Sequence, residues 1–487
     1  MQKACVRELK PFSLAELAEI TQETVDQTRS LVDELLSRGI VRYRTNDAAR
    51  RDYSEDQDRA KPDEVYEFRF VGLLLVRDVV IVSYPKYFCE REPSDEELRL
   101  VFQAIERSCG FAVEPHLEDG GEKADDRLSV MLALLDLYDE YGEYSNYIEG
   151  RELNGNGSID WNRTINNHLP ILSKGRPIYT ELETRKTFRD DSDFIMRLHR
   201  AVLTECSRVF QETGVGELLS LSKVWLSDEE VSDFGDVDSL EWCLSRERSS
   251  QFVDWKLRTL DLLERYLLSK ESEVRRNEVQ ALGTTSFYNV WERACGVALG
   301  NVLHRSLDEL GLNLAGKWIT LGREELLDII PRPKWKRATD EGYIDCGSVS
   351  TLIPDAVAFA TNSHGLRAFC IYDAKYYLPT RHGNIRYQPG VESVTKQFLY
   401  QSAYKEFAVD HGFNLVVNAF LVPDAENEIA KLGRVTFKEV MGEVEIASPL
   451  SNYVYMWALP ANRILEAYVS NTNISSELGT IWDRGER

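Results

Sequence analysis

Two aspartates and a lysine stand in two neighbouring apolar segments. Asp355 lies in the first segment, residues 352–359, and Asp373 and Lys375 lie at the end of the second, residues 368–375. The polar turn between the segments predicts a β-hairpin. Side chains two residues apart on a strand point to the same face, so we expect Asp373 and Lys375 to project together. Asp355 can join them from the neighbouring strand.

This group of side chains predicts metal-dependent hydrolysis of phosphodiester bonds. Asp355 and Asp373 offer the hard oxygen ligands that Mg2+ prefers, and Mn2+ could replace it. The metal would polarise a phosphoryl oxygen and lower the pKa of a bound water. Lys375 would orient that water and stabilise the developing charge. The alternative is a buried Asp–Lys ion pair without a ligand, since charges among apolar strands are costly unless paired or metal-bound.

Two predicted helices carry further candidates for the site. Residues 286–303 predict a helix in which Glu292, beside Trp291, could complete the metal site or be an ordinary exposed charge. Residues 395–409 predict a second helix whose polar side chains could position DNA or a water molecule, or form a solvated face. These side chains are Lys396, Gln397 and Gln401.

The charge of the chain is strongly acidic but uneven. The formal net charge is −23, which argues against a general nucleic-acid coat, because phosphate binding needs a basic face. Residues 330–411 carry 10 Lys and Arg against 8 Asp and Glu, so the acidic excess lies elsewhere. A basic run around Trp335 could grip the DNA backbone and stack on a base, or be a solvated loop. Its basic residues are Arg332, Lys334, Lys336 and Arg337.

Composition and residue spacing narrow the class of protein. The 487 residues suggest about three globular domains. There is no run of 18 apolar residues and no apolar segment at the N-terminus, so we predict neither a membrane span nor a signal peptide. The 8 cysteines form no CxxC pair, which favours a reducing cytoplasm and disfavours structural zinc. Three histidines near the candidate site, His364, His382 and His411, are each expected in exposed loops.

The N-terminal residues predict a winged-helix-like element. A capping-box pattern at Ser13 starts one helix, a second helix follows from Thr24, and a strand follows at residues 40–43. Its role stays open between DNA reading and protein interaction, because the second helix has few basic residues. Residues 45–64 are polar and aperiodic and are predicted to be a linker.

The middle of the chain predicts first strands and then helices. Residues 65–76 and 79–83 predict a hairpin, and residues 94–109 and 126–141 predict helices. Residues 190–272 are expected to be mostly helical. Between them, a turn-rich loop leads into Trp161, and its two Asn-Gly pairs supply left-handed turn positions, so spacing alone favours a simple β-turn. The loop residues are Asn154, Gly155, Asn156 and Gly157.

The pair Pro354-Asp355 with Asp373-Ala374-Lys375 resembles the core motif of the PD-(D/E)xK nucleases. A wider set of motifs within residues 70–405 resembles the LlaJI-type restriction endonucleases, relatives of the McrC nuclease subunit. The matching motifs are Phe70-Val71-Gly72, Tyr84-Pro85-Lys86-Tyr87, the Asn154–Trp161 loop with Thr164-Ile165, Trp291-Glu292, Thr351-Leu352-Ile353-Pro354-Asp355, Asp373-Ala374-Lys375-Tyr376-Tyr377, and Pro389-Gly390-Val391-Glu392-Ser393-Val394-Thr395-Lys396-Gln397.

Together with the residue patterns, the resemblance implies a multidomain α/β and α+β fold. A winged-helix-like element and linker would occupy residues 1–63, and a β-rich McrC-like motor-contacting domain residues 64–180. A helical connecting region would occupy residues 181–275. The C-terminal domain, residues 276–487, would be an α/β domain of the PD-(D/E)xK restriction-endonuclease type.

The resemblance also implies a bacterial restriction system that acts against phage. In such systems an McrB-like AAA+ GTPase recognises and translocates double-stranded DNA, and the McrC-like subunit cuts it. GTP would act only through that partner, since the chain has no Gly-x-x-x-x-Gly-Lys-Ser/Thr motif. The Asn-Gly loop with Trp161 would contact the motor, and the nuclease domains could homodimerise. The catalytic residues would be Asp355, Asp373, Lys375 and Glu292, with the three carboxylates as metal ligands.

Three questions stay open at this stage. Related nucleases often carry Gln and Tyr four residues apart on the helix after the lysine, whereas Gln401 and Tyr404 are three apart, so either Gln397 or Gln401 could serve the site. One rival function is a stand-alone type II restriction endonuclease that reads its own site through the winged-helix-like element. The other is a non-catalytic DNA-binding regulatory protein.

Overall fold

The computed structural model describes most of the chain, in two compact units. Residues 113–282 form the first unit, and residues 2–112 with residues 283–487 form the second. The predicted linker at residues 45–64 lies outside the described residues, as do His364 and His382. The four-domain division stays a prediction. The described residues are 2–44, 65–76, 79–89, 91–109, 127–190, 192–273, 279–339, 342–347, 350–361, 365–381, 388–442 and 449–475.

The candidate catalytic residues belong to a five-stranded mixed sheet of the second unit, in the order β15-β16-β17-β19-β18. The predicted hairpin is confirmed: β15 runs antiparallel to β16, while β16, β17 and β19 run parallel to one another. The apolar interior of β16 is buried, as expected of a central parallel strand. The strands are β15 (Ala356–Thr361), β16 (Arg367–Ala374), β17 (Leu415–Asp424), β18 (Ala430–Val435) and β19 (Val454–Pro460).

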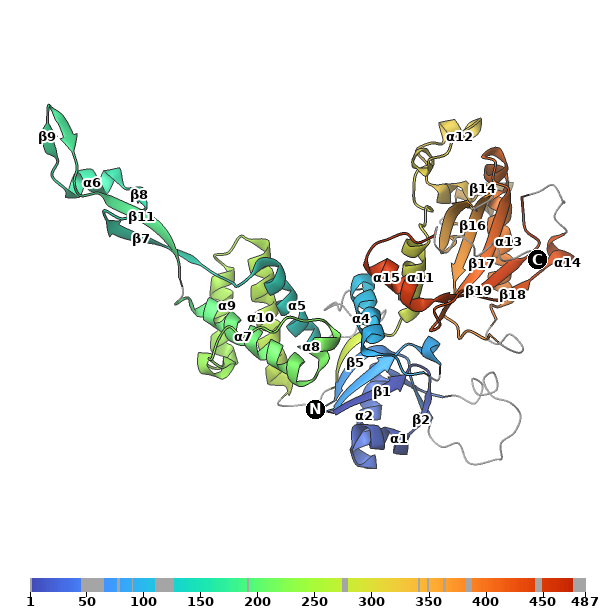
Figure 1. Cartoon of the computed structure of the whole chain (residues 1–487), viewed down its shortest axis with the longest axis horizontal. Helices are drawn as coiled ribbons and strands as arrows, with labels where there is room; N and C mark the ends of the chain where they lie inside the picture. The colour runs from blue at the N-terminus through green and yellow to red at the C-terminus, as the bar shows by residue number, and fades with distance from the viewer. Residues whose placement is uncertain are drawn as a thin grey trace. The chain divides into compact units, whose positions relative to one another are not determined.

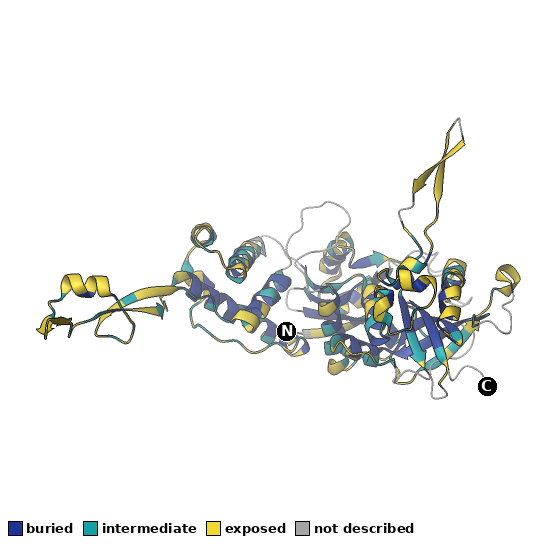
Figure 2. Ribbon diagram, turned by 90° about the horizontal axis from the view of Figure 1, so that it is seen from above, coloured by how far each residue is buried: buried dark blue, intermediate teal, exposed yellow. Residues whose placement is uncertain are grey.

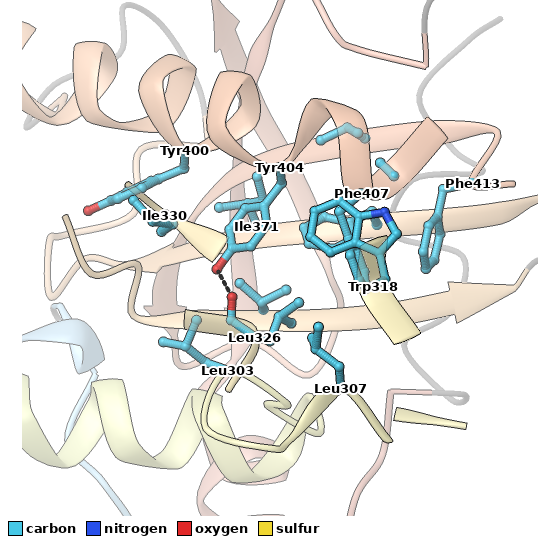
Figure 3. Close-up of a cluster of buried hydrophobic side chains, with 14 residues drawn as sticks. Leu303, Leu307, Trp318, Leu326, Ile330, Ile371, Tyr400, Tyr404, Phe407 and Phe413 are labelled. Carbon is cyan, nitrogen blue, oxygen red and sulfur yellow. Dashed lines mark hydrogen bonds between the residues drawn. The ribbon is translucent and has the colours of Figure 1, made fainter. Parts of the chain in front are cut away.

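Helix α13 (Val391–Asp410) packs on β16 and β17. Its Tyr400, Tyr404 and Phe407 side chains point into a core that includes Ile371 of β16 (Figure 3). The Tyr404 hydroxyl donates a 3.2 Å hydrogen bond to the carbonyl of Leu326 in the same core. The helix begins earlier than the predicted residue 395, because its N-cap is the glycine at position 390.

Helix α11 (Phe287–Ala298) packs on β16 and carries Glu292. It ends before the predicted residue 303, because Gly300 takes a left-handed φ of +71° that closes the helix. The N–H of Asn301 then donates to the carbonyl of Gly296 over 2.8 Å. Helices α4 (Asp95–Cys109) and α15 (Ala461–Val469) pack against α11.

The N-terminal part of the second unit contains the two predicted helices, α1 (Leu14–Thr21) and α2 (Val25–Ser37), and both begin with a capping box. The predicted single strand over residues 65–76 is wrong, because the chain leaves one sheet and enters another at this point. Its first half pairs with β2 and β3, and its second half pairs with β6. The strands are β1 (Gln2–Arg7), β2 (Pro11–Ser13), β3 (Val41–Tyr43), β4 (Val65–Phe68), β5 (Val71–Val76) and β6 (Val79–Tyr84).

These strands form two sheets, with orders β2-β4-β3 and β1-β6-β5-β12. The last strand, β12 (Val279–Thr284), is the segment in which the chain enters the second unit again. Short elements complete this unit. They are η1 (Lys86–Phe88), η3 (Leu307–Leu310), α12 (Lys317–Thr320), η4 (Leu326–Ile329), β13 (Trp335–Thr339), β14 (Gly342–Gly347) and α14 (Lys438–Met441).

The first unit consists of packed helices and a strand-rich arm that projects from them (Figure 1). The prediction that residues 190–272 are mostly helical is confirmed. The helices are α5 (Arg127–Tyr141), α7 (Phe194–Glu212), α8 (Val215–Leu218), η2 (Val231–Phe234), α9 (Val237–Arg248) and α10 (Asp254–Glu273). The arm contains β7 (Tyr147–Leu153), β8 (Ser158–Ile159), α6 (Trp161–Asn167), β9 (Ile171–Ser173), β10 (Arg176–Ile178) and β11 (Glu183–Arg189). Among the described residues, no helix has the length and apolarity needed to cross a bilayer.

Candidate active site

The structure brings Asp355, Asp373 and Lys375 together at one end of β15 and β16. Asp355 directly precedes β15, and its Oδ2 accepts a 2.8 Å hydrogen bond from the backbone N–H of Ala374. Lys375 Nζ lies 2.6 Å from Oδ1 of Asp373, which is buried at the end of β16. The hairpin therefore places both carboxylates and the ammonium group in one cluster, as the spacing predicted.

The two aspartates interact strongly in the metal-free protein. Burial, together with the neighbouring Asp373 carboxylate and Glu292, raises the pKa of Asp355 to about 8. Burial also raises the pKa of Glu292, with the charge of Asp373 as the next cause. Burial alone would lower the pKa of Lys375, but its ion pair with Asp373 and the charge of Asp355 raise it overall. The cluster thus holds more negative charge than one lysine neutralises, so Asp355 retains a proton near neutral pH.

The carbonyl of Leu421 links helix α11, which carries Glu292, to the backbone of Lys375 at the end of β16. The oxygen of Leu421 on β17 accepts a 3.1 Å hydrogen bond from the indole N–H of Trp291 and a 2.8 Å hydrogen bond from the backbone N–H of Lys375. Trp291 is fully buried, and Glu292 follows it on α11. The position of Glu292 relative to Lys375 is therefore set by the shared partner on β17.

Asn301 and Tyr400 position the backbone around Asp355. The Asn301 side chain donates to the carbonyl of Asp355 over 3.3 Å and accepts from the N–H of Val357 over 3.0 Å. The Tyr400 hydroxyl donates a 2.8 Å hydrogen bond to the carbonyl of Ile353. Neither residue could be predicted from the sequence, because a side chain that binds the main chain of a distant segment leaves no spacing signal.

A third group of contacts reaches the strand end from the N-terminal segment. The Tyr376 hydroxyl donates a 2.5 Å hydrogen bond to Glu8, whose other contact is the backbone N–H of Lys86 over 3.2 Å. The Lys86 ammonium lies 4.3 Å from the centre of the Tyr376 ring. Glu8 is buried, and its burial raises its pKa. Tyr376, the residue after Lys375, is thereby tied to the Tyr84–Tyr87 motif, and no local pattern predicts a contact across 290 residues of sequence.

The side chains present fit a divalent cation. Asp373 Oδ1 is buried and accepts no hydrogen bond of regular geometry from a described residue, so the Lys375 contact is an ion pair only. The neighbouring carboxylates of Asp355 and Asp373 supply the oxygen ligands that Mg2+ takes when it keeps several waters. Within the described residues, no three His, Cys, Asp or Glu side chains lie close enough to hold a metal alone. Glu292 as a third ligand therefore stays a prediction.

The two candidate glutamines on α13 have different surroundings. Gln401 is bound by three hydrogen bonds: it donates to Ser451 O and accepts from Ser451 N and from Asn418 Nδ2. Gln397 is fully buried, yet neither atom of its amide has a hydrogen-bond partner among the described residues. Gln401 is thus committed to the fold, whereas the amide of Gln397 makes no such contact, and a part for Gln397 in the site stays a prediction. Lys396 pairs with Glu392 one turn away, over 2.6 Å.

The four basic residues around Trp335 and the histidine at the end of α13 were also singled out from the sequence. Arg332 and Lys334 precede β13, and Lys336 and Arg337 lie on it, all exposed. The expectation that His411 is exposed is wrong. It caps the end of α13, its Nδ1–H donates to the carbonyl of Phe407 over 2.8 Å, and its ring packs against Phe407. The glycine beside it in sequence suggested a loop, but the aromatic core covers it.

The Asn-Gly loop lies in the arm of the first unit and forms the predicted turn between β7 and β8. Only Asn154 takes a left-handed φ, +55°, and its side chain accepts a 2.8 Å hydrogen bond from Leu182 N. Gly157 is required for space instead, since a Cβ there would lie 2.1 Å from the carbonyl oxygen of Arg185. Asn156 lies between them in the turn, and Gly155 donates to Thr184 Oγ1 over 3.1 Å. Trp161 is exposed at the start of α6.

Comparison with known proteins places these features in one family. A family model described as LlaJI restriction endonuclease matches residues 70–448. The type II restriction enzyme BsuMI component YdjA of Bacillus subtilis (strain 168) is 26% identical over 430 residues, covering 84% of this chain and 82% of that protein.

Two solved structures are also similar. One is a half-complex of Thermococcus gammatolerans McrB AAA+ hexamers with bound McrC, with 13% identity, 96% of this chain and 100% of that chain covered, and a TM-score of 0.36. The other is the Thermococcus gammatolerans McrBC complex, with 13% identity, 56% and 88% covered, and a TM-score of 0.22.

Proposed function

The chain belongs to the LlaJI restriction endonuclease family, and from this premise we propose that it is the Mg2+-dependent nuclease subunit, of the PD-(D/E)xK type, of a bacterial restriction complex. It hydrolyses double-stranded DNA together with an McrB-like AAA+ GTPase, and GTP acts only through that partner. One observation carries the proposal: the hydrogen bond that holds Asp355 beside the Asp373–Lys375 ion pair.

The residues divide the chemistry between them. Asp355 and Asp373 would hold the metal, which when bound supplies a polarised phosphoryl oxygen and a water of lowered pKa. Lys375 orients the attacking water and stabilises the negative charge that develops on the phosphoryl oxygens. The water oxygen bonds to phosphorus, the bond from phosphorus to the 3′ oxygen breaks, and the products carry a 5′-phosphate and a 3′-hydroxyl. Because the pKa of Lys375 is raised, its ammonium stays charged throughout.

The N-terminal helices support a division of labour between cutting and DNA reading. The exposed side of α2 presents Asp26 and Asp33, with Arg29 as its basic residue. On the neighbouring sheet, Glu67 neutralises Arg42 over 2.9 Å. Helices that read DNA need basic surroundings to meet the phosphates. The charges of these helices therefore favour contact with a protein, and the choice of the DNA sequence belongs to another polypeptide.

The arm of the first unit suits contact with the partner. Its apolar side chains are exposed rather than packed, as expected of a surface that is covered in a complex. Leu169 has 94% of its surface exposed and Leu172 has 74%. We assign the Asn-Gly loop and Trp161 to the same contact, following the resemblance of that motif to McrC-like subunits.

Plasmid cleavage tests the proposal. The purified chain should cut supercoiled plasmid only with Mg2+, GTP and an McrB-like AAA+ GTPase partner. Asp355→Asn should abolish cutting while leaving partner-dependent GTP hydrolysis intact, because Asp355 lies in the second unit at the nuclease site. Site-specific cutting by the chain alone, without GTP or partner, would instead establish a stand-alone enzyme. A chain that cuts no DNA under any of these conditions would contradict both forms.

A further inference from the structure

The strands β13 and β14 form a two-stranded antiparallel ribbon with no covering layer. Every described residue of the two strands is exposed (Figure 2). Trp335 has 69% of its surface exposed, and Tyr343 has 75%. Large aromatic groups left this open on both strands contribute little to the fold and are accessible to another molecule.

The residues that flank the ribbon in sequence are held next to the nuclease site. Ile330, just before the ribbon, is buried in the core beneath α13 (Figure 3). The Thr351 hydroxyl, just after the ribbon, donates to the carbonyl of Pro331 over 3.1 Å. Two residues later the carbonyl of Ile353 accepts from Tyr400 over 2.8 Å, and Asp355 follows. A short segment that is held by these hydrogen bonds therefore joins the ribbon to Asp355.

Each face of the ribbon combines a cation with an apolar or aromatic side chain. Residues paired across an antiparallel ladder share a face. Arg337 is paired with Ile344, while Ala338, paired with Tyr343, shares the opposite face with Lys336. Neither face is uniformly apolar, so the ribbon is poorly suited to pack on another protein core.

The charges on the ribbon favour a polyanion. Lys336 lies 3.6 Å from Asp345, and Arg332 lies 3.6 Å from Asp328, in exposed pairs that are worth little in water. Lys334 and Arg337 have no acidic partner among the residues that the structure describes. The sequence of residues 332–347 has four basic and three acidic residues, and it belongs to the segment 330–411 whose charge is positive within a strongly acidic chain.

We propose that the β13–β14 ribbon binds DNA by lying in a groove of the duplex beside the nuclease site. This inference rests on the proposed function, since the ribbon would hold the duplex that Asp355, Asp373 and Lys375 cut. A two-stranded β-ribbon fits the major groove of B-form DNA. Lys334 and Arg337 neutralise phosphates, and Trp335 and Tyr343 contact sugars or base edges.

A native thiol on the ribbon reports on DNA contact. Cys346 is exposed on β14, and Cys5 is exposed on β1, away from the ribbon. The full-length chain is mixed with linear duplex DNA, with Ca2+ in place of Mg2+ to prevent cutting, and labelled with a thiol reagent that is read by peptide mass spectrometry. DNA should slow labelling of Cys346 by about tenfold and leave that of Cys5 unchanged. Protection by the GTPase partner alone, and none by DNA, would overturn the inference.

A pair of charge variants provides the second test. Lys334→Ala with Arg337→Ala should weaken duplex binding by about tenfold and reduce the salt dependence of log K by about 2, because two phosphate contacts are lost. The matched control is Lys405→Ala with Lys438→Ala, which removes two exposed lysines of the same unit off the ribbon. Both variants should melt at the wild-type temperature, since the changed side chains are exposed.

The outcomes separate this inference from the proposed function. If the wild-type chain cleaves DNA and the ribbon variant binds DNA as tightly as the wild type, the DNA-binding role of the ribbon is overturned and the nuclease assignment stands. If the ribbon variant binds DNA more weakly but the wild-type chain does not cleave, the role of the ribbon is supported and the nuclease assignment is contradicted. A wild-type chain that binds no duplex DNA would contradict both.

Discussion

The Asp355 carboxylate accepts a 2.8 Å hydrogen bond from the backbone N–H of Ala374, the residue that separates Asp373 from Lys375. The first carboxylate of the site is thereby held at the point between the other two charged residues. Because the main chain of Ala374 makes this contact, its side chain has no part in it. The site depends on the hairpin register that brings residue 355 opposite residue 373.

The crowded carboxylates predict that the metal-free protein loses stability as the pH rises. The pKa of Asp355 is about 8 in the folded chain, against roughly 4 for an unfolded aspartate. Between these values the folded state holds more protons than the unfolded state, so stability falls from about pH 4 to about pH 8 and levels off once both states have lost the proton. Asp355→Asn should remove this slope and raise the melting temperature at pH 8.5 by several degrees, but much less at pH 5.5.

Melting curves in EDTA provide the measurement for Asp355. Adding Mg2+ at pH 8.5 should stabilise the wild type and have little effect on Asp355→Asn, because the cation relieves the repulsion that the variant no longer has. An equal effect of the substitution at both pH values would show that Asp355 is not the group that carries the proton.

The two glutamines of α13 predict opposite results. Gln401→Leu would leave its partners at Ser451 and Asn418 buried without hydrogen bonds, and should destabilise the chain by about 2–4 kcal/mol. Gln397→Leu replaces a buried amide that has no described partner, so it should melt at or above the wild-type temperature. Its DNA cleavage should nevertheless fall, because we propose that the amide of Gln397 serves the site. Full cleavage by Gln397→Leu would remove Gln397 from the site.

A buried histidine predicts acid sensitivity of the helical unit. The backbone N–H of Tyr144 donates to Nδ1 of His199 over 3.0 Å, so this nitrogen must stay unprotonated. Burial lowers the pKa of His199 to about 4, below the value near 6.5 of an unfolded histidine. Between these values the unfolded state binds more protons, so stability falls as the pH falls, by up to about 3 kcal/mol at roughly 1.4 kcal/mol per pKa unit.

The buried thiol of Cys206, on the same helix α7, reports on this loss. Urea midpoints for its exposure, read with a disulfide reagent that reacts in acid, should drop between pH 7 and pH 4.5 in the wild type. His199→Asn keeps an acceptor near the Tyr144 N–H without a titrating group, and its midpoint should change less over this range. Parallel pH profiles for the two proteins would assign the acid sensitivity to other groups.

Local patterns predicted the elements of this fold better than their partnerships. The capping box at Ser13 and the hairpin of β15 and β16 are confirmed, because each depends on residues close in sequence. The strand predicted over residues 65–76 divides between two sheets, and no local pattern signals that change. Likewise, the burial of His411 depends on Phe407 and Trp318, and the second of these is remote in the chain.

The same distinction holds at the candidate site. The spacing of Asp373 and Lys375, with Asp355 on the preceding segment, was enough to predict their cluster. Asn301 and Glu8 could not be predicted, because each acts through tertiary contacts with Asp355 or with Tyr376. Choosing between Gln397 and Gln401 also required the structure, since only the partners of Gln401 distinguish them.

The Asp355–Asp373–Lys375 cluster is proposed to cut DNA, and single-turnover cleavage with the complete complex tests this role. Asp373→Asn and Lys375→Met should each slow cleavage by at least about 100-fold, as loss of a preorganised charged group does in enzymes. Asp410→Asn removes a carboxylate at the other end of α13, where Asp410 accepts a 2.7 Å hydrogen bond from Trp318, and should cut at the wild-type rate. Wild-type rates for Asp373→Asn or Lys375→Met, in complexes that still hydrolyse GTP, would contradict the account.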